Sequence, residues 1–294
     1  MAKVLSNKLA ISLLVVPGML LFLFAVFVPI VMSCFYALTD FQGIGNLHFI
    51  GLENFKQILT NDTTFYRSLL NALLLALAFI FLQHPLSLTF AIILDKLSGK
   101  FEKIFRVIIF IPCVISVMVN AKMWVNIFDS QFGLLNKVLD LLGLGVLKTD
   151  WLGNPHTALP SILFVNCWMG FGWAVMIYYA GVKGISEEMY EAAKIDGASA
   201  FKLYTKILIP LLKPVISMAA TLAVINALKT MEVPFLMTNG GPGDYTQFIA
   251  NYLYTKAFSD SQYGYGNAVS VIFVAVCLLG TLISNKITNS GNYE

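Results

Sequence analysis

Charged residues are scarce in this sequence. Only 12% of its 294 residues are Asp, Glu, Lys or Arg, whereas soluble globular domains contain about a quarter. Hydrophobic residues make up 58%, and the mean hydropathy is +0.77. A water-soluble fold needs more polar surface than this, so the apolar excess must face lipid or other buried helices. The net charge of +3, without a basic run, gives little support to a nucleic-acid-binding function.

The sequence is also poor in the residues that form metal centres and disulfide frameworks. Its four cysteines and three histidines are scattered, and none of the cysteines lies in a CxxC pair. We interpret the cysteines as small buried hydrophobic residues. The apolar stretches lack the nucleophile–base, metal or paired-Asp sets of an intramembrane enzyme, and no G-x-x-x-x-G-K-[ST] phosphate loop is present. We therefore predict no catalytic activity and no metal or cofactor on this chain.

Six apolar stretches are each long enough to cross a bilayer, which takes about 20 residues of helix. They lie at about 9–36, 69–94, 104–127, 158–181, 214–236 and 266–287. The segments between them are short, so the sequence predicts an all-α, polytopic membrane protein with a single transmembrane domain over 1–294. The first stretch is too long for a signal peptide and lacks a small-x-small cleavage site, so it is predicted to be a retained span.

The distribution of lysine and arginine predicts the orientation of these spans. If the N-terminus is inside, the inside segments carry twelve of these residues and the outside segments carry five. Lys122 and Lys229 lie within spans. We therefore expect both termini, and the loop at 182–213, to be cytoplasmic.

The loop at 182–213 has the most informative local pattern. Ser186 can cap a first helix, which Gly197 can end in a left-handed conformation. Ser199 can cap a second helix, which Pro210 is expected to end. Two such helices could project from the membrane as a knob, although periodicity alone also fits an amphipathic helix lying on the headgroups.

The same loop contains Glu-Ala-Ala, three residues, Gly, nine residues, and Ile-x-Ile-Pro. This spacing closely resembles the EAA motif of the permease subunits of ATP-driven (ABC-type) importers, with Ile209 in place of the usual Leu. The matching residues are Glu191, Ala192, Ala193, Asp196, Gly197, Ile207 and Pro210. Two further segments, 238–258 and 264–268, are similar to the carbohydrate branch of that family, as is 51–55 near the N-terminus.

The resemblance implies a type I importer permease with six spans, working with several partners. These are a second homologous permease, a dimeric ATPase that carries ATP and Mg²⁺, and an extracytoplasmic solute-binding protein, in the cell membrane of a prokaryote. The EAA helices would lodge in a cleft of the ATPase. Glu191 would make charged contacts there, Gly197 would supply the bend, and Ile207 and Pro210 would root the second helix at the membrane.

Polar and aromatic residues within the spans are the candidates for a substrate path, because buried ionisable groups cost about 2.5–3.5 kcal/mol each on insertion scales. The candidates are Asn120, Trp124, Asn166, Trp168, Asn226, Lys229 and Glu232. Amides and aromatic rings suit a sugar, but they also serve helix packing. Lys229 and Glu232 could instead form an ion pair within one helix.

The predicted substrate is a sugar or oligosaccharide, moved by alternating access. Glycerol-3-phosphate or a polyol is the alternative, although a phosphate should need more cations at mid-membrane than Lys122 and Lys229. An ion-driven secondary transporter is a further alternative, but such a protein has no reason to carry the EAA loop.

Overall fold

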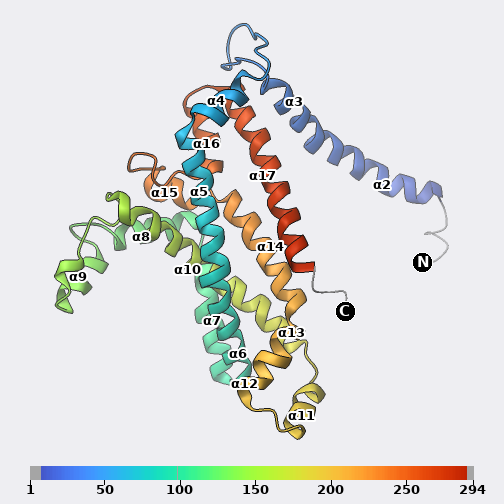
Figure 1. Ribbon diagram of the computed structural model, residues 1–294, viewed down its shortest axis with the longest axis vertical. Helices are drawn as coiled ribbons and strands as arrows, with labels where there is room; N and C mark the ends of the chain where they lie inside the picture. The colour runs from blue at the N-terminus through green and yellow to red at the C-terminus, as the bar shows by residue number, and fades with distance from the viewer. Residues whose placement is uncertain (1–7, 98, 290–294) are drawn as a thin grey trace. The chain divides into compact units, whose positions relative to one another are not determined.

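The computed structural model describes residues 8–97 and 99–289, and helices dominate them (Figure 1). The chain divides into two compact units. One unit comprises Met1–Asp62 and Leu253–Ala275, and the other comprises Thr63–Tyr252 and Val276–Glu294. Within the described residues the only extended pairing is a bridge between Thr39 and Phe49.

The first unit begins with a long apolar helix. Its helical segments are α2 (Lys8–Phe22), η1 (Leu23–Phe27), α3 (Val28–Tyr36), α4 (Glu53–Asn61), η5 (Thr255–Ser259) and the start of α17 (Tyr263–Asn289). α2, η1 and α3 run on from one another, with η1 as a single π-helical turn. Apolar residues surround this helix on all sides and are largely exposed in the isolated chain, as expected of a surface that faces lipid.

Two residues of the segments that resemble the carbohydrate branch make hydrogen bonds or close contacts within this unit. The buried amide of Asn54 donates hydrogen bonds to the carbonyls of Ala37 and Thr39, each 2.9 Å long. The amide of Gly264 donates to the carbonyl of Phe41 at 2.8 Å. A side chain at Gly264 would collide with the carbonyl of Thr39, so only glycine fits this contact.

The second unit holds the remaining helices. They are α5 (Thr63–Ala78), η2 (Phe79–Gln83), α6 (His84–Lys96), α7 (Lys100–Val114), α8 (Val117–Ile127), α9 (Leu134–Leu141), η3 (Gly145–Leu147), α10 (Pro155–Lys183), α11 (Glu187–Ile195), α12 (Ala200–Lys202), η4 (Leu203–Leu208), α13 (Ile209–Leu211), α14 (Lys213–Lys229), α15 (Glu232–Thr238) and most of α16 (Ile249–Tyr254).

α10 is the central helix of this unit and packs against α6, α7 and α14. The side chain of Asn154 accepts a hydrogen bond from the amide of His156 at 3.0 Å, and Pro155 occupies the first turn, where its missing N–H costs nothing. Gly172 lets α7 approach closely, because a Cβ there would clash with the carbonyl of Ile109. The core that results contains Ala91, Leu94, Val175, Tyr178, Tyr179 and Ala219.

Four helices of the described chain are long and apolar enough to cross a membrane. They are Ile11–Tyr36, Thr63–Lys96, Pro155–Lys183 and Tyr263–Ile283. Two bent pairs raise the number to six if each pair counts as one span: Lys100–Val114 with Val117–Ile127, bent by 95°, and Leu203–Leu211 with Lys213–Lys229, bent by 65°. Six spans were expected, but two of them are not the uninterrupted stretches that hydropathy indicates.

The predicted stretch 104–127 is broken at Ile115 and Ser116, which have extended backbone conformations. Pro112 in the last turn of α7 weakens the helix there, and Ser116 caps α8 by accepting from the amide of Val119. The predicted stretch 214–236 is also interrupted, because α14 ends at Lys229 and α15 starts at Glu232. Hydropathy averages over such breaks and therefore does not detect them.

Candidate functional site

The EAA loop folds as two helices joined by a tight turn. α11 ends at Ile195, and Gly197 has the predicted left-handed conformation, with φ +70°. The amide of Ala198 donates to the carbonyl of Ala193 at 3.0 Å, which closes the end of the helix around the glycine. The hydroxyl of Ser199 accepts a hydrogen bond from the amide of Lys202, as expected of a cap.

The prediction that Pro210 ends the second helix is wrong. The helix continues from α12 through the π-helical turn η4 into α13, and Pro210 lies in the first turn of α13. A proline is tolerated there because its position needs no N–H donor. The chain bends two residues later, at Leu212, where α14 sets off in a new direction.

The loop is rooted by a small apolar cluster between the ends of α10 and α14. Val182, Leu208 and Leu212 are almost completely buried there. Ile185, Tyr190 and Tyr204 pack against them from the loop itself. Ile207, which was expected to root the second helix, is half-buried, and Pro210 is exposed.

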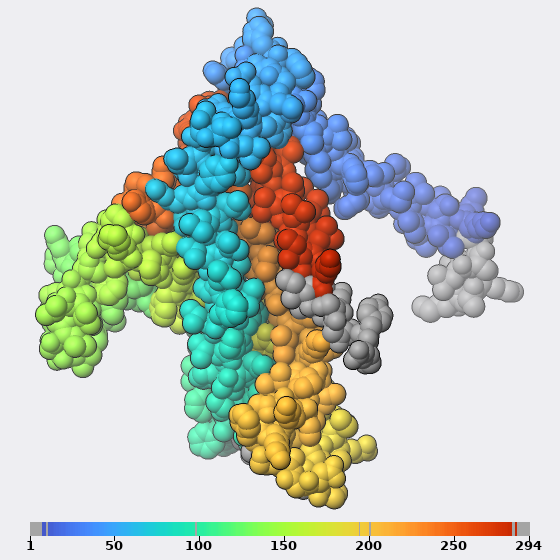
Figure 2. Space-filling view, viewed as in Figure 1, coloured from blue at the N-terminus to red at the C-terminus, as the bar shows by residue number. Residues whose placement is uncertain are grey.

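Most of the EAA residues face outward, away from this cluster. Glu191, Ala192, Asp196 and Gly197 are exposed, whereas Ala193 is buried. Figure 2 shows the loop, in yellow and amber, extending beyond the end of α6. The residues of the motif are therefore presented on a surface that the second unit leaves uncovered.

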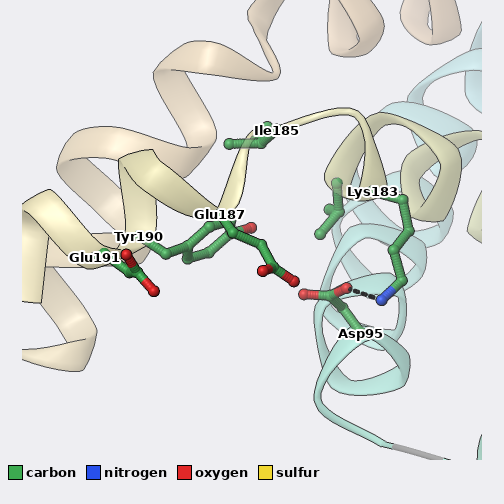
Figure 3. Close-up of a pocket in the computed structure, with 7 residues that line it drawn as sticks. Asp95, Lys183, Ile185, Glu187, Tyr190 and Glu191 are labelled. Atoms are coloured by element: carbon green, nitrogen blue, oxygen red, sulfur yellow. Dashed lines mark ion pairs between the residues drawn. The ribbon is translucent and has the colours of Figure 1, made fainter.

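A pocket of about 380 Å³ lies between α11 and the ends of α6 and α10 (Figure 3). It is lined by Asp95, Val182, Lys183, Ile185, Glu187, Tyr190 and Glu191. The ammonium of Lys183 and the carboxylate of Asp95 form an ion pair at 2.8 Å, which joins α10 to α6 at the root of the loop. The pocket is acidic, since three carboxylates line it with one ammonium.

Tyr190 contributes an unusual hydroxyl to this site. The oxygen is buried and has no hydrogen-bond partner among the described residues. Burial and the nearby carboxylate of Asp95 raise the pKa of Tyr190, so the hydroxyl stays neutral and remains a donor. An unpaired buried hydroxyl is costly unless another group satisfies it.

The ion pair continues into a polar network on three helices. The hydroxyl of Tyr179 donates to the carboxylate of Glu102 at 2.5 Å, and the guanidinium of Arg106 donates to Tyr179 at 3.0 Å. Glu102 and Arg106 also form an ion pair on α7. The ammonium of Lys183 lies 5.7 Å from the centre of the Tyr179 ring. Sequence reasoning missed the network because its charged members are isolated residues at helix ends, far apart in the chain.

Comparisons with known proteins agree with this architecture. The family model described as "binding-protein-dependent transport system inner membrane component" matches residues 87–289. The chain belongs to this family.

The permease is similar to curated relatives along almost its whole length. It is 33% identical to the probable ABC transporter permease protein YurN of Bacillus subtilis, over 98% of this chain and 99% of that protein. It is 32% identical to the arabinooligosaccharides transport system permease protein AraP of Bacillus subtilis, over 97% of this chain and 90% of that protein. The permease is thus a multi-pass membrane protein of a transport family, not of a catalytic one.

A solved structure with the same fold is a chain of the bacterial alginate ABC transporter, in complex with an alginate pentasaccharide-bound periplasmic protein. The TM-score is 0.84 over 98% of this chain and 96% of that chain, at 22% identity. The predicted type I fold is confirmed by this likeness.

The structure separates the substrate-path candidates of the permease into buried and exposed groups. Asn120 is fully buried, and its amide donates to the carbonyls of Pro112 at 3.0 Å and Ile115 at 3.1 Å. These carbonyls are left without helical partners by the break between α7 and α8. The Asn120 amide therefore satisfies the carbonyls that the break leaves unpaired.

The aromatic candidates come together. The rings of Trp124 and Trp168 meet edge to face at 5.2 Å, and Phe164 lies at the same distance from Trp124. Asn166, by contrast, donates to the carbonyl of Ile162 in its own helix at 2.9 Å.

Asn226, Lys229 and Glu232 are all exposed. Lys229 is the last residue of α14 and Glu232 the first of α15, so the alternative of an ion pair within one helix is wrong. No ion pair between them occurs in the described part of the chain. All three side chains are free to face a partner or a path formed with one.

The segment 238–247, which resembles the carbohydrate branch, is a tightly bonded loop. The hydroxyl of Thr246 donates to the carbonyl of Gly241 at 2.6 Å and meets the hydroxyl of Thr238 at 2.7 Å. The buried amide of Asn71 on α5 donates to the carbonyls of Tyr245 and Gln247 at 2.9 and 2.8 Å. These bonds fix the loop on the scaffold of the second unit.

Proposed function

We propose that this permease imports a sugar or oligosaccharide by alternating access, driven by a separate dimeric ATPase that carries ATP and Mg²⁺. The name of the AraP relative supports this class of substrate, as does the alginate pentasaccharide bound to the periplasmic protein that accompanies the similar transporter. The match of the chain to the carbohydrate-branch segments supports it as well.

The observation that carries the proposal is the architecture of the EAA loop. α11 presents Glu191 and Ala192 outward, next to the left-handed turn at Gly197. The root of the loop is held by the apolar cluster and by the ion pair between Lys183 and Asp95. The EAA loop therefore projects from a well-packed root. Such a loop can bind an ATPase and transmit its movement to α10 and α14.

The proposed assembly has a second, homologous permease and an extracytoplasmic solute-binding protein. Both termini and the EAA loop lie in the cytoplasm in this arrangement, as the distribution of lysine and arginine indicates. The membrane is the cell membrane of a prokaryote. The second permease would face exposed polar residues such as Asn226, which the single chain leaves uncovered.

The proposed substrate path uses the exposed face of α14 and the aromatic cluster of α8 and α10. Asn226 can hydrogen-bond sugar hydroxyls, and the Trp124 and Trp168 rings offer apolar platforms. Lys229 and Glu232 supply charges of opposite sign at the break between α14 and α15. A neutral polyhydroxylated solute suits this mixture better than a phosphate.

The test is ATP-dependent sugar uptake by the complete transporter carrying Glu191→Lys or Gly197→Pro. The first reverses the charge of the exposed EAA face, and the second forbids φ +70° at the turn. We expect either variant to reduce uptake to background while the protein still inserts into the membrane.

Matched controls are Glu188→Lys, on the same helix outside the motif, and Gly45→Pro, at another positive φ in an open loop. Both controls should keep most of the uptake. Normal uptake in the Glu191 and Gly197 variants, or uptake driven by a proton gradient rather than ATP, would overturn the proposal.

A further inference from the structure

The short helix α9 has its apolar face on the outside. Leu134, Val138 and Leu141, together with Leu142 directly after the helix, fall within an arc of about 100° at 3.6 residues per turn. All four are exposed, and Leu141 retains 87% of its accessible surface. A helix of a water-soluble protein would turn this face inward.

A buried asparagine on the opposite side of α9 fixes this orientation. Asn136 is only 4% exposed, and its amide donates to the carbonyls of Ser130 and Thr149, both at 3.1 Å. Its carbonyl oxygen accepts a hydrogen bond from the indole of Trp151 at 2.9 Å. The polar side of α9 is therefore tied to the base of the segment, and the leucine side cannot rotate inward without breaking three bonds.

The apolar surface extends past the helix in both directions. Phe132 before α9, and Val146 and Leu147 in η3, retain 76%, 97% and 57% of their accessible surface. In Figure 1 the α9 segment, drawn in green, reaches outward beyond α8. Of the other helices in the described chain, α8 and η3 are its main neighbours.

The position of the segment in the chain indicates what covers this face. It connects α8, the second helix of a bent pair that counts as one span, to α10, which is a candidate span by itself. A segment between two such spans lies where the bilayer surface begins. Lys137 lies at the flank of the apolar arc, exposed and without an ion-pair partner in the part of the chain that the structure describes. An ammonium beside an apolar arc matches a phospholipid, with its phosphate above its acyl chains.

We propose that the segment 132–147 is an interfacial anchor: α9 lies in the headgroup region of the bilayer, with Leu134, Val138, Leu141 and Leu142 among the acyl chains. The anchor holds the connection between α8 and α10 at a fixed depth while other parts of the permease move. It does not depend on the substrate of the transporter.

The experiment uses the complete transporter reconstituted in phosphatidylcholine–phosphatidylglycerol nanodiscs, with the four native cysteines replaced by alanine. Single cysteines introduced by Leu141→Cys or Val138→Cys carry a nitroxide spin label. Asp140→Cys, on the polar side of the same helix, is the matched control. The measurement compares relaxation of the label by oxygen, which partitions into lipid, with relaxation by a water-soluble nickel chelate.

At Leu141 and Val138 we expect oxygen to be the stronger relaxant, and at Asp140 the nickel chelate. Stronger relaxation by nickel at Leu141 would place the face in water and overturn the proposal. Weak relaxation by both agents would show that a protein, such as the second permease or the binding protein, covers the face, and would also overturn it. Uptake plays no part in the readout, so this result stands apart from that of the proposed function.

Discussion

The two loops most similar to the importer family are built in opposite ways. The loop 238–247 is stabilised by hydrogen bonds between its own side chains and backbone and by the amide of Asn71. Among the described residues the EAA loop is held at its root, while α11 presents exposed residues such as Glu191 and Ile195. The first loop is stabilised by contacts within the chain, whereas the second exposes residues that a partner protein could contact.

This difference predicts which substitutions lower the stability of the protein and which lower its transport activity. Removing a bond from the loop 238–247 should cost stability, and activity should fall only because the protein unfolds. Changing the exposed side of the EAA loop should cost activity at almost constant stability. The variants below test that division, from the largest expected effect on stability to the smallest.

Asn71→Ala should have the largest effect. It removes two hydrogen bonds of a side chain that is 2% exposed and leaves the carbonyls of Tyr245 and Gln247 without these partners. The expected loss is about 2–6 kcal/mol, at about 1–3 kcal/mol for each of the two carbonyls left unpaired. Thermal unfolding of the purified transporter in detergent measures it. Asn61→Ala, the same change at an exposed site, should leave the midpoint unchanged; equal midpoints for both variants would contradict the assignment.

Reversing the ion pair at the root of the EAA loop should have a smaller effect on stability. Asp95→Lys places two cations side by side, and because the partners are partly exposed the free energy of unfolding should change by less than about 1 kcal/mol. Uptake should nevertheless fall, because the end of α10 loses the ion pair that joins it to α6 at the root of the EAA loop. The double variant Asp95→Lys with Lys183→Asp restores opposite charges and should recover part of the uptake. If it recovers none, the ion pair does not position the loop.

Tyr190→Phe should have the smallest effect on stability. The hydroxyl has no partner in the described residues, so its removal should leave the unfolding midpoint unchanged or raise the stability by about 0.5–1 kcal/mol. A fall in uptake at unchanged stability would indicate that a partner protein supplies the missing acceptor in the assembled transporter. A clear loss of stability would mean that the hydroxyl is satisfied within the chain.

Local chemistry was the part of the EAA loop that could be predicted. Gly197 follows a helix and can adopt a positive φ at low cost, and Ser199 has the oxygen that a helix start needs. Pro210 shows the limit of such rules. A proline stops a helix only where the helix needs an N–H donor at that position to bond the carbonyl one turn earlier. The π-helical turn η4, which precedes Pro210, removes that need.

The substrate-path candidates show the same limit for residue types. Asn120 and Asn226 are both amides in apolar helices, and the sequence favoured Asn226 only slightly, because it lies one turn from Lys229. The structure buries Asn120 in the break between α7 and α8 and leaves Asn226 exposed on α14. Only the position of the break distinguishes them, and that position depends on how α7 and α8 pack against the rest of the chain.

The sequence by itself determined the class of protein and its family, because long apolar stretches and the EAA spacing are properties of neighbouring residues along one chain. The tertiary structure alone decided what joins helices that are distant in sequence: the pair of Lys183 with Asp95, the bonds of Asn71, and the outward face of α9 that Asn136 enforces. The physical reason is that a hydrogen bond or ion pair depends on distances of a few ångströms between two groups. Those distances are set by the packing of whole helices, not by the residues on either side of each group.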